Sequence, residues 1–263
     1  MTARLTLRTL ALGYLALLLL FPVGMVFVRT LEDGIGPVWE AVTRPNALHA
    51  LWLTVLVAVI AVAANTVFGV LCAMVLVRHE FRGKVLLNAV LDLPLAVSPI
   101  VVGLALLLVY GRVGYAGGWL VDVGIRVVFS TPGIILATIF VSLPFVVREV
   151  VPVLREIGTE QEQAATTLGA SAFQTFRLVT LPAIRSGVAY GLVLTTARAI
   201  GEFGAVSVIS GKLAGRTQTL TVYVEDRFQN FDLVGCYAAS VILALIAVAT
   251  LLLTNLSKPR EDY

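Results

Sequence analysis

Long apolar runs separated by short polar connections occupy most of the chain. The runs cover residues 10–28, 50–77, 85–110, 126–148, 187–209 and 233–256. Most reach the roughly 20 residues that an α-helix needs to cross a bilayer. The pattern therefore predicts an all-α integral membrane protein with six transmembrane helices. We expect the first run to remain in the mature protein as a transmembrane helix and not to be a cleaved secretory signal. It is longer than the core of such a signal, and no small-x-small cleavage site follows it.

Two of the runs contain residues that interrupt a regular helix. Asp92, Pro94 and Pro99 lie in the third run, where the prolines remove backbone donors and leave carbonyls that need other partners. Gly201 and Gly204 lie in the fifth run, where they allow close backbone approach or a local break. Broken helices recur beside polar paths through a membrane, although a simple kink would also explain either proline alone.

The composition supports a membrane location. Hydrophobic residues make up 59% of the chain and charged residues 13%, and the mean hydropathy of +0.95 lies outside the range of soluble globular domains. The formal net charge of +3 is scattered and gives no footprint for nucleic-acid binding. Cys72 and Cys236 lie in or beside apolar runs, which predicts buried free thiols instead of a disulfide or a metal site.

The basic residues predict the orientation, because Lys and Arg concentrate in cytoplasmic connections. One set comprises the two termini, the 78–84 loop and the 148–185 loop, and the other set comprises the alternate connections. The first set holds eleven basic residues and the second holds seven: Arg4, Arg8, Arg78, Arg82, Lys84, Arg148, Arg155, Arg177, Arg185, Lys258 and Arg260 against Arg29, Arg44, Arg112, Arg126, Lys212, Arg216 and Arg227. We therefore expect both termini and the 148–185 loop in the cytoplasm.

A polar segment, TEQEQAATTLGASAFQTFRLVTLP, stands between two apolar runs at residues 159–182. It is too charged to lie in lipid. Thr159 followed three residues later by Glu162 is a capping-box pattern, which predicts that a helix begins there. Gly169 can end this helix by taking the left-handed conformation.

A second short helix is predicted in the same segment. Ser171 with Gln174 repeats the capping-box pattern, and Pro182 is expected to end the helix that begins at about residue 172. Apolar residues recur at helical spacing on both helices: Ala164, Ala165, Leu168, Phe173, Phe176 and Val179. An ordinary amphipathic loop on the bilayer surface would share part of this pattern.

Residues with candidate chemistry are few. The nucleotide-binding pattern G-x-x-x-x-G-K-[ST] is absent, because Gly211 and Lys212 are adjacent but Val206 occupies the place of the first glycine. His49 and His79 are isolated, and neither a Ser-His-Asp nor a zinc-type spacing is visible. We expect no catalytic residue and no metal, and a membrane-embedded enzyme is poorly supported.

One pair of opposite charges is expected inside the membrane. Arg198 and Glu202 are four residues apart in the fifth run, which would place both on one face of a helix. Charged side chains at that depth usually face the protein interior or a water-filled path. Two interpretations remain open: an internal ion pair that fixes the helix, or a substrate path in which the guanidinium meets an oxyanion.

The polar segment resembles the EAA loop of the permeases of binding-protein-dependent ABC importers. The residues that match the motif are Ala164, Ala165, Gly169, Val179, Leu181 and Pro182. Gln163 occupies the place of the motif's glutamate, and Glu162 comes immediately before it. The resemblance implies a cytoplasmic coupling helix that contacts an ATPase through these motif residues together with Glu162, Gln163 and Phe173. If the motif's glutamate makes a salt bridge in relatives, Glu162 would make that contact here, one residue earlier, or Gln163 would replace it with a neutral hydrogen bond.

Two further stretches resemble the permeases of the sulfate, thiosulfate and molybdate importers. They are Leu-Pro-x-x-x-Ser-Pro-x-Val-x-Gly at residues 93–103 and Arg-x-x-Gly-Glu-Phe-Gly-Ala at residues 198–205, and the segment at 206–220 looks most like the second permease subunit of the sulfate system. The resemblance implies a type I ABC importer permease fold. Its parts would be an N-terminal helix and external loop at 1–49, the transmembrane domain at 50–256 and a cytoplasmic tail at 257–263. The substrate-path residues would be Arg198, Glu202, Ser98 and Pro99.

The implied assembly is heteromeric and lies in the bacterial plasma (inner) membrane, in contact with lipid. It joins this chain to a homologous second permease, a cytoplasmic ATPase dimer that binds ATP and Mg, and an extracytoplasmic sulfate-binding protein. This chain would bind no cofactor, and the assembly would import sulfate or thiosulfate. Molybdate and tungstate remain alternative substrates. An ATPase-independent secondary anion transporter is the alternative from another class, although such a carrier has no need of a capped loop.

Overall fold

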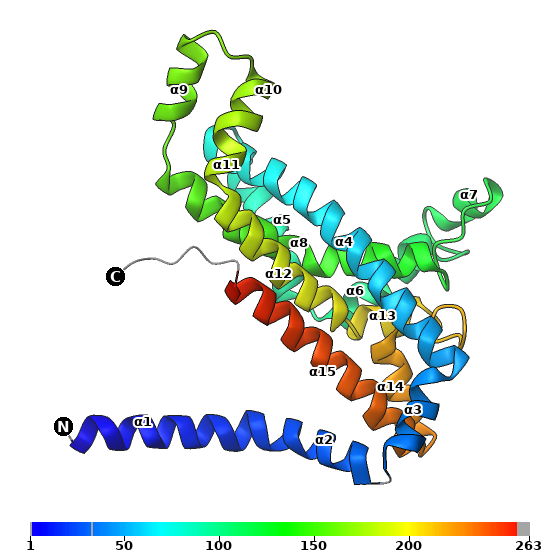
Figure 1. The fold of residues 1–263 in the computed structure, drawn as a ribbon. Helices are drawn as coiled ribbons and strands as arrows, with labels where there is room; N and C mark the ends of the chain where they lie inside the picture. The colour runs from blue at the N-terminus through cyan, green and yellow to red at the C-terminus, as the bar shows by residue number, and fades with distance from the viewer. Residues whose placement is uncertain (1, 33, 257–263) are drawn as a thin grey trace.

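The structure is a computed structural model that describes residues 2–32 and 34–256, and every regular element in these residues is helical (Figure 1). This confirms the all-α prediction. The tail at 257–263 lies outside the described residues. The elements are α1 (Thr2–Leu15), a π-helical stretch (Ala16–Leu20), α2 (Phe21–Glu32), α3 (Ile35–Thr43), α4 (Pro45–Arg78), α5 (Lys84–Ala96), α6 (Pro99–Tyr110), α7 (Gly117–Asp122), α8 (Thr131–Glu156), α9 (Glu160–Thr167), α10 (Ala172–Thr175), a second π-helical stretch (Phe176–Thr180), α11 (Leu181–Ala183), α12 (Arg185–Ile200), α13 (Gly204–Ile209), α14 (Leu220–Gln229) and α15 (Leu233–Leu256).

Four helical segments of the described residues are long and apolar enough to cross a bilayer by themselves: Thr6–Glu32, Pro45–Arg78, Thr131–Glu156 and Leu233–Thr250. Two pairs of helices meet the same test when each pair is taken together, namely Lys84–Ala96 with Pro99–Tyr110, and Ala172–Ala183 with Arg185–Ile200. The total is six if each bent pair crosses once, which is consistent with the number of apolar runs.

The centre of the bundle is formed by α4, α8 and α12, which pack against one another along much of their length. Val146 of α8 lies between two glycines. A Cβ atom on Gly69 of α4 would come within 2.7 Å of Val146 Cβ, and one on Gly191 of α12 would come within 2.9 Å of Val146 Cα. Small residues at such crossings let helix backbones approach closely, which is a main source of packing energy between membrane helices.

The third apolar run is not one straight helix, because α5 and α6 meet at 111°. The break lies at Val97 and Ser98, whose backbones are extended with ψ of 136° and 134°, and Pro99 begins α6. A proline pushes the residue before it out of the helical region and fits the first turn of a new helix, so Pro99 sets this bend. Pro94 lies inside α5 without ending it.

The fifth apolar run is also divided. α12 ends at Ile200, residues 201–203 are not helical, and α13 begins at Gly204. The prediction of one helix over 187–209 is therefore wrong, whereas the local break expected at the glycines is confirmed. The glycines at the break allow the close backbone contacts that α13 makes with α6.

The helix α8 differs from the fourth predicted span at both ends. It begins at Thr131 instead of 126 and continues through Pro144 and Pro152 to Glu156. Interior prolines are tolerated in a membrane helix when neighbouring helices enclose the freed backbone groups, and α4, α5 and α12 pack against α8. The longer α8 reaches directly to the polar segment at 159–182.

An ion-pair cluster joins the start of α4 to the connection between α14 and α15. Arg44 Nη1 lies 2.6 Å from Asp232 Oδ2, and Arg227 Nη1 lies 3.6 Å from the same oxygen. Burial alone would raise the pKa of Asp232, but the backbone N–H of Gly235 and the two guanidinium groups hold this pKa below its ordinary value. The carboxylate thus stays charged and ties the ends of three helices together.

The N-terminal helix α1 lies apart from the bundle, whereas α2 leads back to it and contacts α15 (Figure 1). None of the most apolar window of Thr6–Glu32 is buried within the chain. The surface of this span is therefore open to lipid or to another polypeptide.

A methyl group added at Gly191 tests the packing of α12 on α8. The new Cβ would lie 2.9 Å from Val146 Cα, a backbone atom that cannot rotate away. We expect Gly191→Ala to lower the Tm of the detergent-solubilised protein, with an overpacking cost of about 1–3 kcal/mol. Gly24→Ala is the matched control, because nothing lies within 4 Å of a Cβ there. An unchanged Tm for Gly191→Ala would contradict this packing.

Candidate functional site

The polar segment at 159–183, called the coupling segment below, projects from one end of the bundle beyond the ends of α4 and α8 (Figure 1). It consists of α9 followed by a second helical stretch that includes α10, the second π-helical turn and α11. The two short helices predicted from the sequence are therefore present. Their ends differ in detail from the prediction.

The capping box predicted at Thr159 and Glu162 is absent. Thr159 does precede α9, but its side chain makes no capping hydrogen bond to the helix backbone. Its hydroxyl instead accepts a hydrogen bond from Gln163 Nε2 at 3.1 Å. The backbone of Thr159 has φ of −116° and ψ of −2° instead of the extended conformation of a capping residue, and the Glu162 carboxylate is held in an ion pair elsewhere. Gly169 takes the left-handed conformation with φ of 88°, which confirms its predicted role after the end of α9.

The second capping box is confirmed. Gln174 N–H donates to Ser171 Oγ at 3.3 Å, and Ser171 N–H donates to Gln174 Oε1 at 2.8 Å. The helix that begins here runs through Ala183, so Pro182 does not end it as predicted. Proline fits the first turn of α11, and the chain then bends by 71° into α12. Ile184 at this bend is 0% exposed and anchors the segment in the core of the bundle.

One guanidinium connects the coupling segment to two long helices. Arg78, the last residue of α4, donates to the carbonyl oxygens of Leu154 at 3.1 Å and Gly158 at 2.7 Å. Its Nε lies 2.9 Å from Glu162 Oε2. The Glu162 carboxylate also accepts a hydrogen bond from the hydroxyl of Thr180 at 2.8 Å. These contacts join the ends of α4 and α8 to both parts of the coupling segment.

This network concerns Glu162 and Gln163, the two positions at which the segment departs from the EAA motif. The ion pair within this chain is made by Glu162, and Gln163 is exposed. The side chains of Arg78 and Glu162 are only 11% and 19% exposed, so the pair is largely shielded from water. In the sequence Arg78 contributes only to the predicted topology, because no local pattern pairs it with a residue 84 positions away.

The outer surface of the coupling segment is apolar and open. Leu168 is 88% exposed and Phe173 is 69% exposed. An open groove lies between its two parts, lined by Ala164, Ala165, Val179 and Pro182 among others. The inner surface is different, because Phe176 packs on the cluster that contains Ile184. The motif residues therefore form an exposed surface on a segment that is anchored from behind.

The two charged residues of the fifth run form an ion pair, but not along one helix. Arg198 Nη1 lies 2.5 Å from Glu202 Oε2, although α12 ends at Ile200 and Glu202 belongs to the break. The other carboxylate oxygen accepts a hydrogen bond from the backbone N–H of Ala205 at 2.7 Å. Glu202 is 2% exposed at its side chain and Arg198 is 28% exposed. The carboxylate is thus buried with its partners, whereas part of the guanidinium is accessible.

The two broken helices meet in space. A Cβ atom on Gly204 would lie 2.7 Å from Pro99 Cβ, and one on Gly103 would lie 2.8 Å from the carbonyl oxygen of Ala205. Ser98, at the bend before Pro99, is exposed. The structure therefore brings together two stretches that the sequence analysis had singled out separately.

The comparisons with known proteins agree with this architecture. The family model for "Binding-protein-dependent transport system inner membrane component" matches residues 65–262. The chain is 50% identical over 254 residues to the "Sulfate transport system permease protein CysW" of Synechocystis, which covers 97% of this chain and 92% of that protein. The protein of the same name from Escherichia coli K12 is 49% identical, with coverage of 94% and 85%. The E. coli protein named CysT is 40% identical, with coverage of 93% and 89%.

Solved structures show the same fold. A bacterial ABC transporter involved in the import of the acidic polysaccharide alginate matches with a TM-score of 0.80 at 16% identity, covering 99% of this chain and 96% of that chain. A bacterial alginate ABC transporter solved in complex with an alginate pentasaccharide-bound periplasmic protein matches with a TM-score of 0.77 at 18% identity, covering 98% of this chain and 94% of that chain. From the family match and the identities above, the chain belongs to the inner membrane components of binding-protein-dependent transport systems, the permeases of ABC importers.

Proposed function

We propose that this chain is a permease subunit of an ATP-driven importer that carries sulfate, or thiosulfate, across the bacterial plasma membrane. The observation that carries the proposal is a rigid coupling segment that is tied to the transmembrane bundle through Arg78 and Glu162. The relatives named as sulfate permeases, which match nearly the whole chain, support the substrate. The chain is a transport subunit and not an enzyme.

The coupling segment has the properties needed to receive force from a partner. Its exposed apolar residues, Leu168 and Phe173, would enter a groove on a cytoplasmic ATPase. The Ser171 capping box stabilises the N-terminal end of the second helix. Because Arg78 holds Glu162 and the end of α8 at once, a displacement of the segment would move α4 and α8 with it. Rigid-body movement of this kind can change access to a path between helices.

The complete importer would contain a homologous second permease, an ATPase dimer that binds ATP and Mg, and an extracytoplasmic sulfate-binding protein. The similarity to both the CysW and the CysT proteins supports two related permeases in one assembly. The alginate transporter in complex with a periplasmic protein supports delivery of the anion from outside. Both termini and the coupling segment would lie in the cytoplasm, as the distribution of Lys and Arg predicts.

The substrate path would pass the junction of the two broken helices. Arg198 is partly accessible there, and Ser98 is exposed at the bend before Pro99. An oxyanion could compete with Glu202 for the guanidinium, because both are held by charge-assisted hydrogen bonds. Glu202 would then neutralise Arg198 again after the anion has passed.

Reconstitution of the purified assembly tests this function. We expect the permease to co-purify with an ATPase, and we expect sulfate uptake into vesicles to require both ATP and the binding protein. Competition by unlabelled thiosulfate, molybdate and tungstate then ranks the anions. Uptake by the purified chain alone, down a gradient and without ATP, would instead identify a secondary transporter.

Substitution of Gly169 tests the geometry of the coupling segment. A β-branched side chain is strained at a φ of 88°, by about 1–3 kcal/mol, so Gly169→Val should distort the turn between α9 and α10. We expect ATP-driven uptake to fall more than about tenfold, the equivalent of roughly 1.4 kcal/mol, while the amount of protein in the membrane stays unchanged. Gly124→Val is the control, because Gly124 has a similar φ of 81° outside the coupling segment. Full uptake by Gly169→Val would count against coupling through this turn.

The contact between Arg78 and Glu162 can be measured with a double-mutant cycle. Arg78→Gln and Glu162→Gln should each increase hydrogen exchange in the coupling segment, because each leaves a shielded charge without its partner. We expect the double variant to be less destabilised than the sum of the two, with a coupling energy of about 1–3 kcal/mol. The exposed pair Arg29 and Glu32, at 2.7 Å, is the control and should show no measurable coupling. Additive effects at Arg78 and Glu162 would mean that the pair does not hold the segment.

A further inference from the structure

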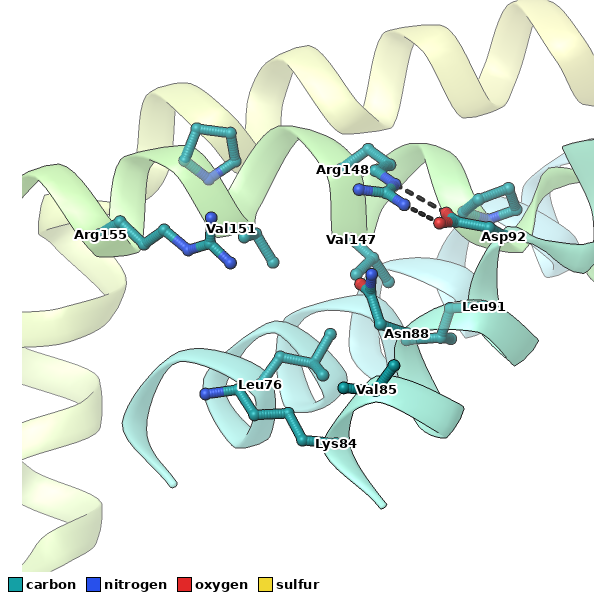
Figure 2. A pocket seen from close by; sticks show the side chains of 12 residues that line it. Leu76, Lys84, Val85, Asn88, Leu91, Asp92, Val147, Arg148, Val151 and Arg155 are labelled. Carbon is teal, nitrogen blue, oxygen red and sulfur yellow. Dashed lines mark hydrogen bonds and ion pairs between the residues drawn. The ribbon is translucent and has the colours of Figure 1, made fainter. Parts of the chain in front are cut away.

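A pocket of about 440 Å³ opens between α5 and α8, beside the end of α4 (Figure 2). Its polar lining residues are Lys84, Asn88, Asp92, Arg148 and Arg155, and the other lining residues are apolar. The pocket lies at the same end of the bundle as the coupling segment, because α4 ends and α5 begins there. It does not include the residues assigned above to coupling or to the substrate path.

The pocket has an excess of positive charge, with three basic side chains against one carboxylate. Arg148 is already paired, because its Nε donates to Asp92 Oδ1 at 2.8 Å. Lys84 Nζ lies 2.6 Å from Glu80, whose side chain is 88% exposed, and such surface pairs contribute little. Two positive charges, those of Lys84 and Arg155, therefore face the pocket without a strongly held counter-ion.

Two donors in the pocket are unused. Arg155 and Asn88 make no hydrogen bond or ion pair within the part of the chain that the structure describes. Figure 2 shows both side chains pointing into the space between the two helices, Arg155 from α8 and Asn88 from α5. A guanidinium, an amide and a weakly paired ammonium thus lie around one cavity.

The deeper part of the pocket contains charged side chains that are partly exposed. Arg148 lies seven residues before Arg155 on α8, which is about 10 Å along a helix. The side chains of Arg148 and Asp92 are nevertheless 48% and 34% exposed. Charged groups at such a depth face water or protein and not lipid chains. The pocket is therefore a polar recess that faces water or a protein partner, and in the orientation predicted from the basic residues it opens toward the cytoplasm.

We propose that this recess binds a tetrahedral oxyanion through Arg155, Lys84 and Asn88, with Arg148 in its inner wall. Guanidinium and ammonium groups form charge-assisted hydrogen bonds with oxyanions, and an amide adds a neutral donor. An arriving dianion would displace Lys84 from Glu80. If the anion is the transported sulfate, which rests on the proposed function, the recess holds it after release to the cytoplasmic side. The phosphate of an anionic lipid has the same chemistry and is the other source.

Binding of radiolabelled inorganic sulfate to the complete importer tests the proposal. The complex is placed in phosphatidylcholine vesicles without ATP, at constant ionic strength. We expect Arg155→Ala to weaken sulfate binding about tenfold or more, and Asn88→Ala about threefold to tenfold, since hydrogen bonds to charged groups contribute more than neutral ones. Asn88→Ala is informative because it removes a donor without changing the charge.

Arg82→Ala is the matched control. Arg82 is an exposed cation in the same connection, two residues before Lys84, and it does not line the recess. We expect its sulfate affinity to stay within about twofold of wild type, because an exposed charge is screened by salt. If Arg155→Ala and Asn88→Ala bind sulfate as tightly as Arg82→Ala does, the recess is not an oxyanion site.

A second arm identifies the source of the anion. Vesicles of phosphatidylcholine mixed with phosphatidylglycerol replace the neutral vesicles. If a lipid phosphate occupies the recess, phosphatidylglycerol should weaken sulfate binding by wild type and by Arg82→Ala but not by Arg155→Ala. Unchanged binding by wild type assigns the recess to the free anion. ATP-driven uptake by wild type is measured in parallel, so that loss of the proposed function is distinguished from failure of the oxyanion site.

Discussion

The requirement that polar groups inside a bilayer find partners within the protein shapes this chain throughout. Asn65 of α4 is 0% exposed, and its Nδ2 donates to the carbonyl of Ile139 at 3.0 Å and to Ser142 Oγ at 2.9 Å, both on α8. The hydroxyls of Thr54 and Thr138 each donate a hydrogen bond to the carbonyl oxygen four residues earlier. These three residues thus either bond to their own helix, as Thr54 and Thr138 do, or fix the position of a neighbouring one, as Asn65 does.

The same requirement explains why the broken helices lie together. At each break the backbone leaves the helical hydrogen-bond ladder, so it must be enclosed by protein or by water. The Glu202 carboxylate supplies an acceptor for the N–H of Ala205, and Thr221 Oγ1 donates to the carbonyl of Glu202 at 2.8 Å. Pro99 packs against Gly204 on the other side. The two interruptions thus lie against each other, and each break has partners within the protein.

At the end of the bundle that carries the coupling segment, long-range contacts fix the position of that segment. The coupling segment is exposed on its outer face and anchored on its inner face by Arg78, Thr180 and Ile184. An ion pair with side chains 11% and 19% exposed is less screened by solvent than a surface pair, so it can hold two elements in register. Under the proposed function, a segment anchored in this way would transmit displacement to the bundle, whereas a flexible loop would absorb it.

Local patterns in the sequence determined the all-α architecture, the apolar spans, the cap at Ser171 and the left-handed glycine at 169, because each depends on residues within one or two helical turns. They also marked the breaks at Pro99 and Gly201, although the bend of 111° and the division of the fifth run needed the structure. Only the tertiary structure decided that Glu162 pairs with Arg78 and that Thr159 makes no capping box. It also decided that Pro99 meets Gly204 and that Asn88 and Arg155 share a recess. The physical reason is that these contacts join residues far apart in the chain, and their geometry depends on how α4, α5, α8 and α12 pack.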